Sequence, residues 1–225
     1  MKLMKRNLCG ALLGLSLAAC GPMDEAELET PASQEQELPA NCTSVDDTNM
    51  TNHACVHYNN GADNVNVSSG GSVNTKHKHY TVTLPPGLGG SVTFVPSATT
   101  AGDTTESVSF YLSPTTTLTV TLSGSTVTPG ISETISSGCG LSQVVTYDLT
   151  VGSTYTLNLG AVAGNQVRLV PEYLDDNKAT WYRDADGDTY GTPINPISTA
   201  CEPPSGYVNR RFDCNDSNPA IYNCL

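Results

Sequence analysis

Hydrophobic and polar residues alternate with a period of two through the middle of this chain. The alternation recurs in short rows with Thr or Ser at most intervening positions: Tyr80/Val82/Leu84, Val92/Phe94, Val108/Phe110/Leu112, Leu118/Val120/Leu122, Val145/Tyr147/Leu149, Tyr155/Leu157/Leu159 and Val167/Leu169. Turn-forming Gly, Pro and Asn separate the rows, as in Pro85-Pro86-Gly87. Such rows predict half-buried antiparallel strands. We therefore expect residues 41–173 to form an all-β domain, an antiparallel β-sandwich or jelly roll.

The first forty residues follow a different pattern. Three positive charges lie within Met1–Arg6, and the twelve residues Leu8–Ala19 are mainly small and apolar. This segment is too short to span a membrane but fits a signal peptide. Leu17-Ala18-Ala19-Cys20 resembles a bacterial lipobox, which implies cleavage before Cys20 and lipidation of its thiol. Ordinary secretory cleavage that leaves Cys20 unmodified is the alternative.

We expect residues 1–19 to be a lipoprotein signal peptide and residues 20–40 an acidic disordered tether. The tether has acids but no base and almost no large apolar residue, so it cannot bury enough surface to fold. The predicted location is outside the cytoplasm. A lipid would anchor the chain to a bacterial membrane, at the outer membrane or cell surface.

Composition narrows the class of function. The chain has 22 Asp+Glu against 10 Lys+Arg, a formal charge of −12. Such a chain repels phosphate backbones, which argues against nucleic-acid binding and favours cations as partners. The sequence has no Gly-x-Ser-x-Gly, His-Glu-x-x-His, phosphate-loop or dinucleotide motif. We therefore expect a protein that is not an enzyme.

Six cysteines remain after Cys9 leaves with the signal peptide and Cys20 takes the lipid: Cys42, Cys55, Cys139, Cys201, Cys214 and Cys224. An even number in an exported chain predicts disulfides, and six cysteines allow fifteen pairings. Proximity favours Cys42–Cys55 and Cys201–Cys214, which leaves Cys139–Cys224. A thiolate zinc site is less favoured because the chain lacks a C-x-x-C pair.

The segment 174–225 carries two acidic groups. Asp184, Asp186 and Asp188 can converge on one ion if the backbone curls at Gly187. Hard oxygen ligands of this kind suit Ca²⁺, with the Tyr190 carbonyl as a further ligand. The second group, which could complete this site or form another, consists of Asp213, Asn215 and Asp216. An acidic, disulfide-stapled tail without metal is the alternative.

The blocks WYRDADGDTYGTP, ACEPPSGYV and DCND, followed by a last Cys, resemble the MopE-type metal-binding repeat of myxobacterial and related bacterial surface proteins. The usual form is D-x-D-G-D-G-Y-G, C-x-x-P-x-G-Y-V, D-C-D-D and a final Cys, here matched over residues 181–224. Thr189 replaces a frequent Gly, Asn215 a frequent Asp, and residues 219–222 depart from Pro-Gly-Ala. The resemblance implies metal binding. The repeat is named after a copper-binding protein, but these ligand types fit calcium better.

All four histidines, His53, His57, His77 and His79, fall within the predicted β domain. If His77 and His79 lie in one strand, they share a face that looks toward solvent or a loop, opposite Tyr80. His53 and His57 flank Cys55 near the start of the domain. Four imidazoles gathered together would bind Zn²⁺ or Cu²⁺. Exposed histidines without metal are the alternative.

The sequence therefore predicts a non-enzymatic cell-surface lipoprotein. It would join a β-sandwich to a small, irregular, disulfide-stapled calcium-binding motif and serve in surface binding or adhesion. Its expected partners are the membrane, through the lipid, a metal ion and an unidentified surface ligand. Two alternatives stay open. One is a copper- or zinc-binding protein that uses the histidines. The other is an accessory module of a secreted hydrolase, because residues 79–173 resemble the β-sandwich modules of bacterial secreted peptidases.

Overall fold

A computed structural model describes residues 42, 44–45 and 47–222. Within these residues the regular secondary structure is mainly strand, as the alternation predicts. One short α-helix, α1 (Asn52–Asn59), follows a π-helical turn at Asp47–Thr51 and precedes the first strand. The strands are β1 (Asn64–Ser68), β2 (His79–Thr83), β3 (Gly90–Phe94), β4 (Thr105–Ser113), β5 (Leu118–Leu122), β6 (Ser125–Thr126), β7 (Ile131–Thr134), β8 (Gln143–Thr150), β9 (Tyr155–Leu159), β10 (Gln166–Tyr173), β11 (Ala179–Arg183), β12 (Thr192–Thr199) and β13 (Tyr207–Val208).

The strands form three sheets. The largest has the order β1-β2-β10-β4-β8-β7, and all its pairs are antiparallel except β1 with β2. A second sheet has the antiparallel order β3-β9-β5-β6. The third, smaller sheet has the antiparallel order β12-β11-β13 and is formed by the segment 179–208.

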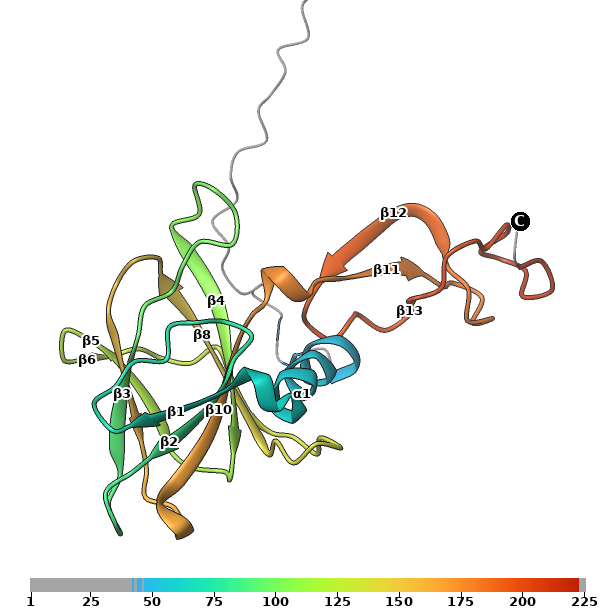
Figure 1. The fold of residues 1–225 in the computed structure, drawn as a ribbon. Helices are drawn as coiled ribbons and strands as arrows, with labels where there is room; N and C mark the ends of the chain where they lie inside the picture. Colours follow the sequence, from blue (N-terminus) through green and yellow to red (C-terminus); the bar gives the residue numbers. More distant parts are fainter. Residues whose placement is uncertain (1–41, 43, 46, 223–225) are drawn as a thin grey trace, which may run out of the picture. The chain divides into compact units, whose positions relative to one another are not determined.

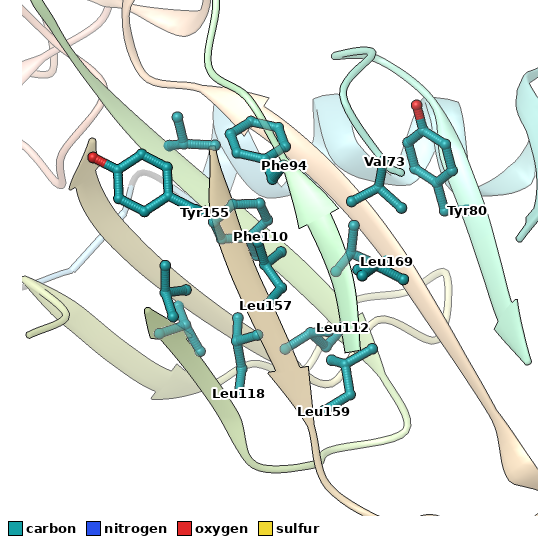
Figure 2. Close-up of a cluster of buried hydrophobic side chains, with 14 of the residues drawn as sticks. Val73, Tyr80, Phe94, Phe110, Leu112, Leu118, Tyr155, Leu157, Leu159 and Leu169 are labelled. Atoms are coloured by element: carbon teal, nitrogen blue, oxygen red, sulfur yellow. The ribbon is translucent and has the colours of Figure 1, made fainter. Parts of the chain in front are cut away.

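The six- and four-stranded sheets share one hydrophobic core, shown in Figure 2. Every alternating row identified in the sequence contributes side chains to it. Phe94 of β3 and Phe110 of β4 meet edge to face with ring centroids 5.1 Å apart. The Tyr147 hydroxyl of β8 donates a hydrogen bond to the Leu118 carbonyl of β5 at 3.2 Å. Contacts of both kinds therefore join the two sheets.

The expectation of half-buried strands is wrong for the centre of the six-stranded sheet. Tyr111 of β4, Val144 of β8 and Val170 of β10 point away from the shared core, yet all are fully buried. They pack in a second cluster with Met50 and Ala54, which come from the helical N-terminal segment. Helix α1 lies beside β10 in Figure 1. The sheet is covered on this face because the segment 47–59, which we expected to belong to an all-β domain, is helical.

Two disulfides have both cysteines in the described residues, and neither is a pairing that proximity favoured. Cys42 bonds to Cys201 and Cys55 bonds to Cys139. The expected pairs Cys42–Cys55 and Cys201–Cys214 are therefore wrong, and so is Cys139–Cys224. Cys214 is also disulfide-bonded, and its partner lies outside the described residues. Sequence proximity failed because each of the two bonds joins segments that only the tertiary fold brings together.

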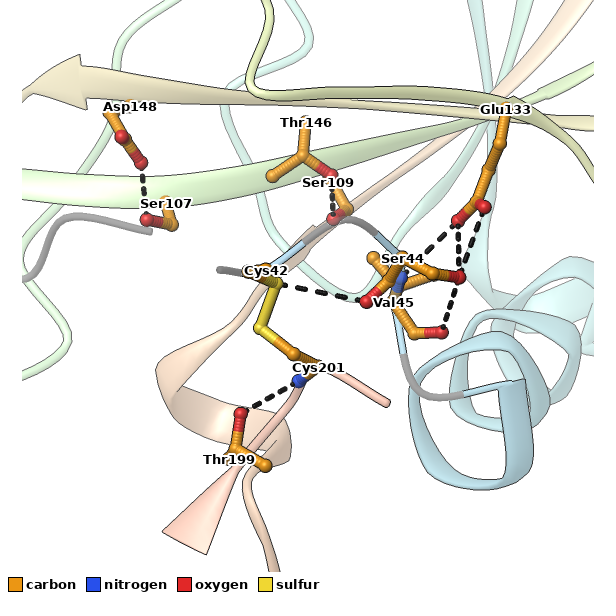
Figure 3. Close-up of a disulfide and its surroundings, with 10 residues drawn as sticks. All are labelled: Cys42, Ser44, Val45, Ser107, Ser109, Glu133, Thr146, Asp148, Thr199 and Cys201. Carbon is orange, nitrogen blue, oxygen red and sulfur yellow. Dashed lines mark hydrogen bonds between the residues drawn. A yellow bond between two sulfur atoms is a disulfide. The ribbon is translucent and has the colours of Figure 1, made fainter. Parts of the chain in front are cut away.

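The Cys42–Cys201 bond, shown in Figure 3, is one part of a larger junction. Val45 pairs with Cys201 as an isolated antiparallel bridge, and the Glu202 amide donates to the Ser44 carbonyl at 3.2 Å. The Glu133 carboxylate accepts from the Ser44 hydroxyl at 3.0 Å and from the Val45 amide at 3.2 Å. This junction fixes the start of the described chain to the segment that follows β12.

None of the helices in the described part of the chain is long and apolar enough to cross a membrane. The proposed signal peptide, Cys20 and the tether lie outside the described residues.

Candidate metal centres

The loop between β11 and β12 brings together the three carboxylates of Asp184, Asp186 and Asp188. One oxygen from each lies within 4.8 Å of the others. Asp184 accepts hydrogen bonds from the Gly187 amide at 2.7 Å and the Thr189 amide at 3.0 Å. These bonds curl the backbone so that alternate side chains converge. The local sequence therefore encodes the site directly.

Two residues of this loop have a left-handed backbone. Gly187 has φ +80°, as the sequence predicted for the curl. Thr189 has φ +78°, which is unfavourable for a β-branched residue. The resembled repeat frequently has Gly at this second position, and the backbone conformation gives a physical reason for that preference.

Three carboxylate oxygens in and beside the acidic loop are buried without a hydrogen-bond partner among the described residues: the Oδ2 atoms of Asp186, Asp188 and Asp213. The Asp213 side chain is buried, with the residue only 5% exposed. Burial raises the pKa of the Asp186 carboxyl, and the negative charges of Asp188, Asp213 and Asp184 raise it further. A hydrogen bond from the Asp188 amide acts in the opposite direction and lowers this pKa. The electrostatics therefore couple Asp213 to the loop.

A backbone connection, and not the expected disulfide, carries the second acidic group to the loop. Gly191 forms a parallel bridge with Arg211, in which the Gly191 amide donates to the Arg210 carbonyl at 2.8 Å. The Asp213 amide in turn donates to the Gly191 carbonyl at 3.2 Å. A side chain on Gly191 would collide with Tyr182, because an added Cβ would lie 2.5 Å from the tyrosine Cβ.

The side chains of Asp216 and Asn215, which were also expected to be ligands, have structural partners. Asp216 accepts from the Ala185 amide at 2.6 Å and pairs with the Arg183 guanidinium at 3.3 Å, so it braces the start of the loop. The Asn215 side-chain oxygen accepts from the Ser217 hydroxyl at 2.7 Å. The Tyr190 amide donates to Asp188 at 2.8 Å, which closes the loop at its other end.

A second candidate centre lies on the outer face of the six-stranded sheet. His53 and His57 occupy positions i and i+4 of α1, so one side of the helix presents both. His77 comes from the turn before β2 and Glu172 from β10. One ligand atom from each of these four residues lies within 4.8 Å of the others.

Glu172 is the buried element of this centre, with its side chain fully inaccessible. Its Oε2 atom lies 2.8 Å from Nδ1 of His77 and 3.2 Å from Nδ1 of His53, although the latter contact is poorly aligned for a hydrogen bond. Burial alone would raise the pKa of the Glu172 carboxyl, but the two histidines outweigh it and lower the pKa. The same carboxylate raises the pKa of His53 despite partial burial.

His79 does not join the other three histidines, which corrects the expectation that it shares a solvent-facing surface with His77. Strand β2 begins at His79, whereas His77 lies in the preceding turn with φ +57°. His79 is buried and stacks on the Tyr58 ring at 4.7 Å between centroids. Burial lowers its pKa, with a contribution from the positive charge of Arg168.

Sequence reasoning missed Glu172 and Asp63, the two carboxylates that hold the histidines. Asp63 ends the 3₁₀ turn Gly61–Asp63 and lies 2.9 Å from Nδ1 of His57. Lys78, with a smaller contribution from His57, lowers the pKa of the Asp63 carboxyl to about 2. Glu172 could have been suspected from one signal, namely a carboxylate inside the apolar strand QVRLVPEY.

Comparison with known proteins adds no assignment: no family model matches this chain, and no curated protein matches it.

Proposed function

We propose that this chain is a calcium-binding, non-enzymatic surface protein whose C-terminal segment holds one Ca²⁺ in the loop 184–190. The three buried oxygens without partners, on Asp186, Asp188 and Asp213, carry this proposal. Buried carboxylate oxygens are costly unless a hydrogen bond or a cation satisfies them. A cation bound between them would also remove the mutual repulsion of the acidic side chains.

Calcium fits these ligands better than other biological cations do. All the candidate ligand atoms are hard oxygens, and Ca²⁺ takes six to eight of them in flexible geometry. Asp184, Asp186, Asp188 and Asp213 supply carboxylates, and backbone carbonyls such as that of Tyr190 would add to the shell. Neither His nor Met nor free Cys occurs between residues 181 and 213, so softer ions have less to attract them.

We further propose that residues 181–224 are a copy of the MopE-type repeat and that the two large sheets form a β-sandwich. Support for the sandwich comes from the core that the two sheets share. In this proposal Cys20 carries the lipid that anchors the chain, and the acidic tether holds the folded part away from the membrane. The role at the cell surface is then binding or adhesion, with Ca²⁺ ordering a segment too small for a good core of its own.

Calcium should raise the melting temperature of the full chain. For an affinity typical of extracellular modules, 10 mM Ca²⁺ is expected to raise the melting temperature by about 3–10 °C over a chelated sample. The Asp186→Asn variant should lose this rise, because Asn keeps the size of the side chain but removes a charged ligand. Differential scanning calorimetry with and without Ca²⁺ measures the effect.

Asp103→Asn is the matched control. It makes the same change in charge, but Asp103 caps a turn of the β domain by accepting from the Thr100 amide. This variant should keep the full calcium response. An equal response in wild type and Asp186→Asn, or no response of wild type at 10 mM Ca²⁺, would contradict the proposed site.

A further inference from the structure

The three clustered histidines have the same pattern of contacts on one ring nitrogen. Nδ1 of His57 faces Asp63, and Nδ1 of both His53 and His77 faces Glu172. A carboxylate can only accept, so the hydrogen bonds of His57 and His77 place a proton on Nδ1 of those two rings. Histidines that bind metals in proteins are held in this way. The His53 contact is not aligned for a hydrogen bond, and Nε2 of His77 also lies 3.5 Å from Oδ2 of Asp176.

The two helical histidines place their Nε2 atoms 3.3 Å apart. In the absence of metal, a proton on one of these nitrogens lets the two rings form a hydrogen bond, and a cation between them would replace that proton. Two nitrogens bound to one tetrahedral Zn²⁺ would be separated by roughly 3.4 Å, given Zn–N distances of about 2.0–2.1 Å. The observed spacing therefore matches the edge of a zinc coordination tetrahedron.

The third ring completes this arrangement. The ring centroids of His53, His57 and His77 are 4.8, 4.9 and 5.1 Å apart, a nearly equilateral triangle. Three imidazoles bound to one tetrahedral ion would have centroids roughly 5 Å apart, from the same bond lengths. His77 reaches this position through a left-handed backbone at φ +57°, an uncommon conformation for a residue other than glycine.

The surroundings favour a cation. The Glu172 side chain is fully buried, and its Oε1 atom has no hydrogen-bond partner among the described residues. Lys76 and Lys78, which flank His77, are each paired with a carboxylate, Asp176 at 2.6 Å and Asp63 at 2.8 Å. These three carboxylates against two ammonium groups leave one negative charge beside the three imidazoles.

From this geometry we infer a second metal site, independent of calcium, in which His53, His57 and His77 bind a borderline transition-metal ion of the Zn²⁺ class. Glu172 and Asp63 act as positioning residues that hold the imidazoles. The fourth coordination position faces outward, because the three histidine side chains remain between 17% and 35% exposed. A water molecule or a ligand from another molecule can occupy it.

The Cys55–Cys139 disulfide serves this site as well as the fold. Cys55 lies between the two helical histidines in the sequence, and its bond to Cys139 ties α1 to the loop before β8. An eight-residue helix is only marginally stable by itself. The crosslink therefore fixes the helix that supplies two of the three imidazoles.

Isothermal titration of the full chain with ZnCl₂ tests the site, in buffer with 10 mM Ca²⁺ so that the carboxylate loop is occupied. Wild type should bind one Zn²⁺. The His53→Gln/His57→Gln double variant should lose this binding. Glu172→Gln should bind about 10–100-fold more weakly, as expected when a carboxylate that orients a metal-bound histidine is lost. Asp186→Asn, which alters the calcium loop, should bind zinc as wild type does.

His79→Gln is the histidine control, because the residue lies outside the cluster, and it should keep full zinc affinity. Circular dichroism shows whether each variant is folded. Cobalt substitution gives an independent result, since tetrahedral Co²⁺ absorbs intensely in the visible range, and folded His77→Gln protein should lack that band. Zinc affinity equal in wild type and the folded double variant, or an octahedral Co²⁺ spectrum in wild type, would overturn the inference.

Discussion

Replacing Cys42 and Cys201 together by alanine should lower the free energy of unfolding by about 5 kcal/mol, the chain-entropy estimate for a crosslink between residues 159 positions apart. This is a large part of the stability of an ordinary domain. The bond closes nearly all of the described chain into one loop, so its removal frees the unfolded chain more than any local change would. Urea denaturation of wild type and the double variant measures the difference.

Ser44→Ala is the control for this junction. It removes the hydroxyl that donates to Glu133 at 3.0 Å but leaves the crosslink in place. The expected cost is about 1 kcal/mol, as for one partly exposed hydrogen bond. If the double alanine variant costs no more than Ser44→Ala, the Cys42–Cys201 bond does not form in the protein.

Phe110→Ala should destabilise the protein by about 3–5 kcal/mol. The Phe110 ring is fully buried between the two large sheets and contacts the Phe94 ring of the opposite sheet edge to face. Truncation removes apolar contact with both sheets and leaves a cavity in the shared core. Equilibrium unfolding in urea, monitored by circular dichroism, gives the free energy.

Val65→Ala on strand β1, where the side chain is exposed, should change stability by about 0.5 kcal/mol or less. A double-mutant cycle with Phe94 adds a sharper criterion, since paired aromatic rings couple by about 0.5–1.5 kcal/mol. A Phe110→Ala cost near that of Val65→Ala, with no coupling to Phe94, would contradict a core shared by the two sheets.

The sequence predicted those features whose cause is local. Alternation along β4, β8 and β9 reports directly which side chains meet the core, because the period of a strand is two. The acidic loop could be predicted from the sequence for the same reason, because the hydrogen bonds from the Gly187 and Thr189 amides to Asp184 join residues only a few positions apart.

Features that depend on distant segments were not predicted. The helix at residues 52–59 has a polar sequence with little helical periodicity, and it is held by packing on Val170 and by the Cys55–Cys139 bond. Without that helix, the i, i+4 relation of His53 and His57 could not be recognised. Glu172 lies 115 residues after His57 in the sequence, and only the tertiary fold brings its carboxylate into contact with the imidazoles of His53 and His77. The disulfide pairings were predicted wrongly for the same reason, because the bonded cysteines are distant in sequence.

The most direct test of the calcium site is the metal content of the full chain, equilibrated with 1 mM CaCl₂, separated from free ion and analysed by inductively coupled plasma mass spectrometry. We expect one Ca²⁺ per chain in wild type and in Asp103→Asn, and none in Asp186→Asn. Calcium absent from wild type, or retained in full by Asp186→Asn, would contradict the proposal that the loop 184–190 is a calcium site.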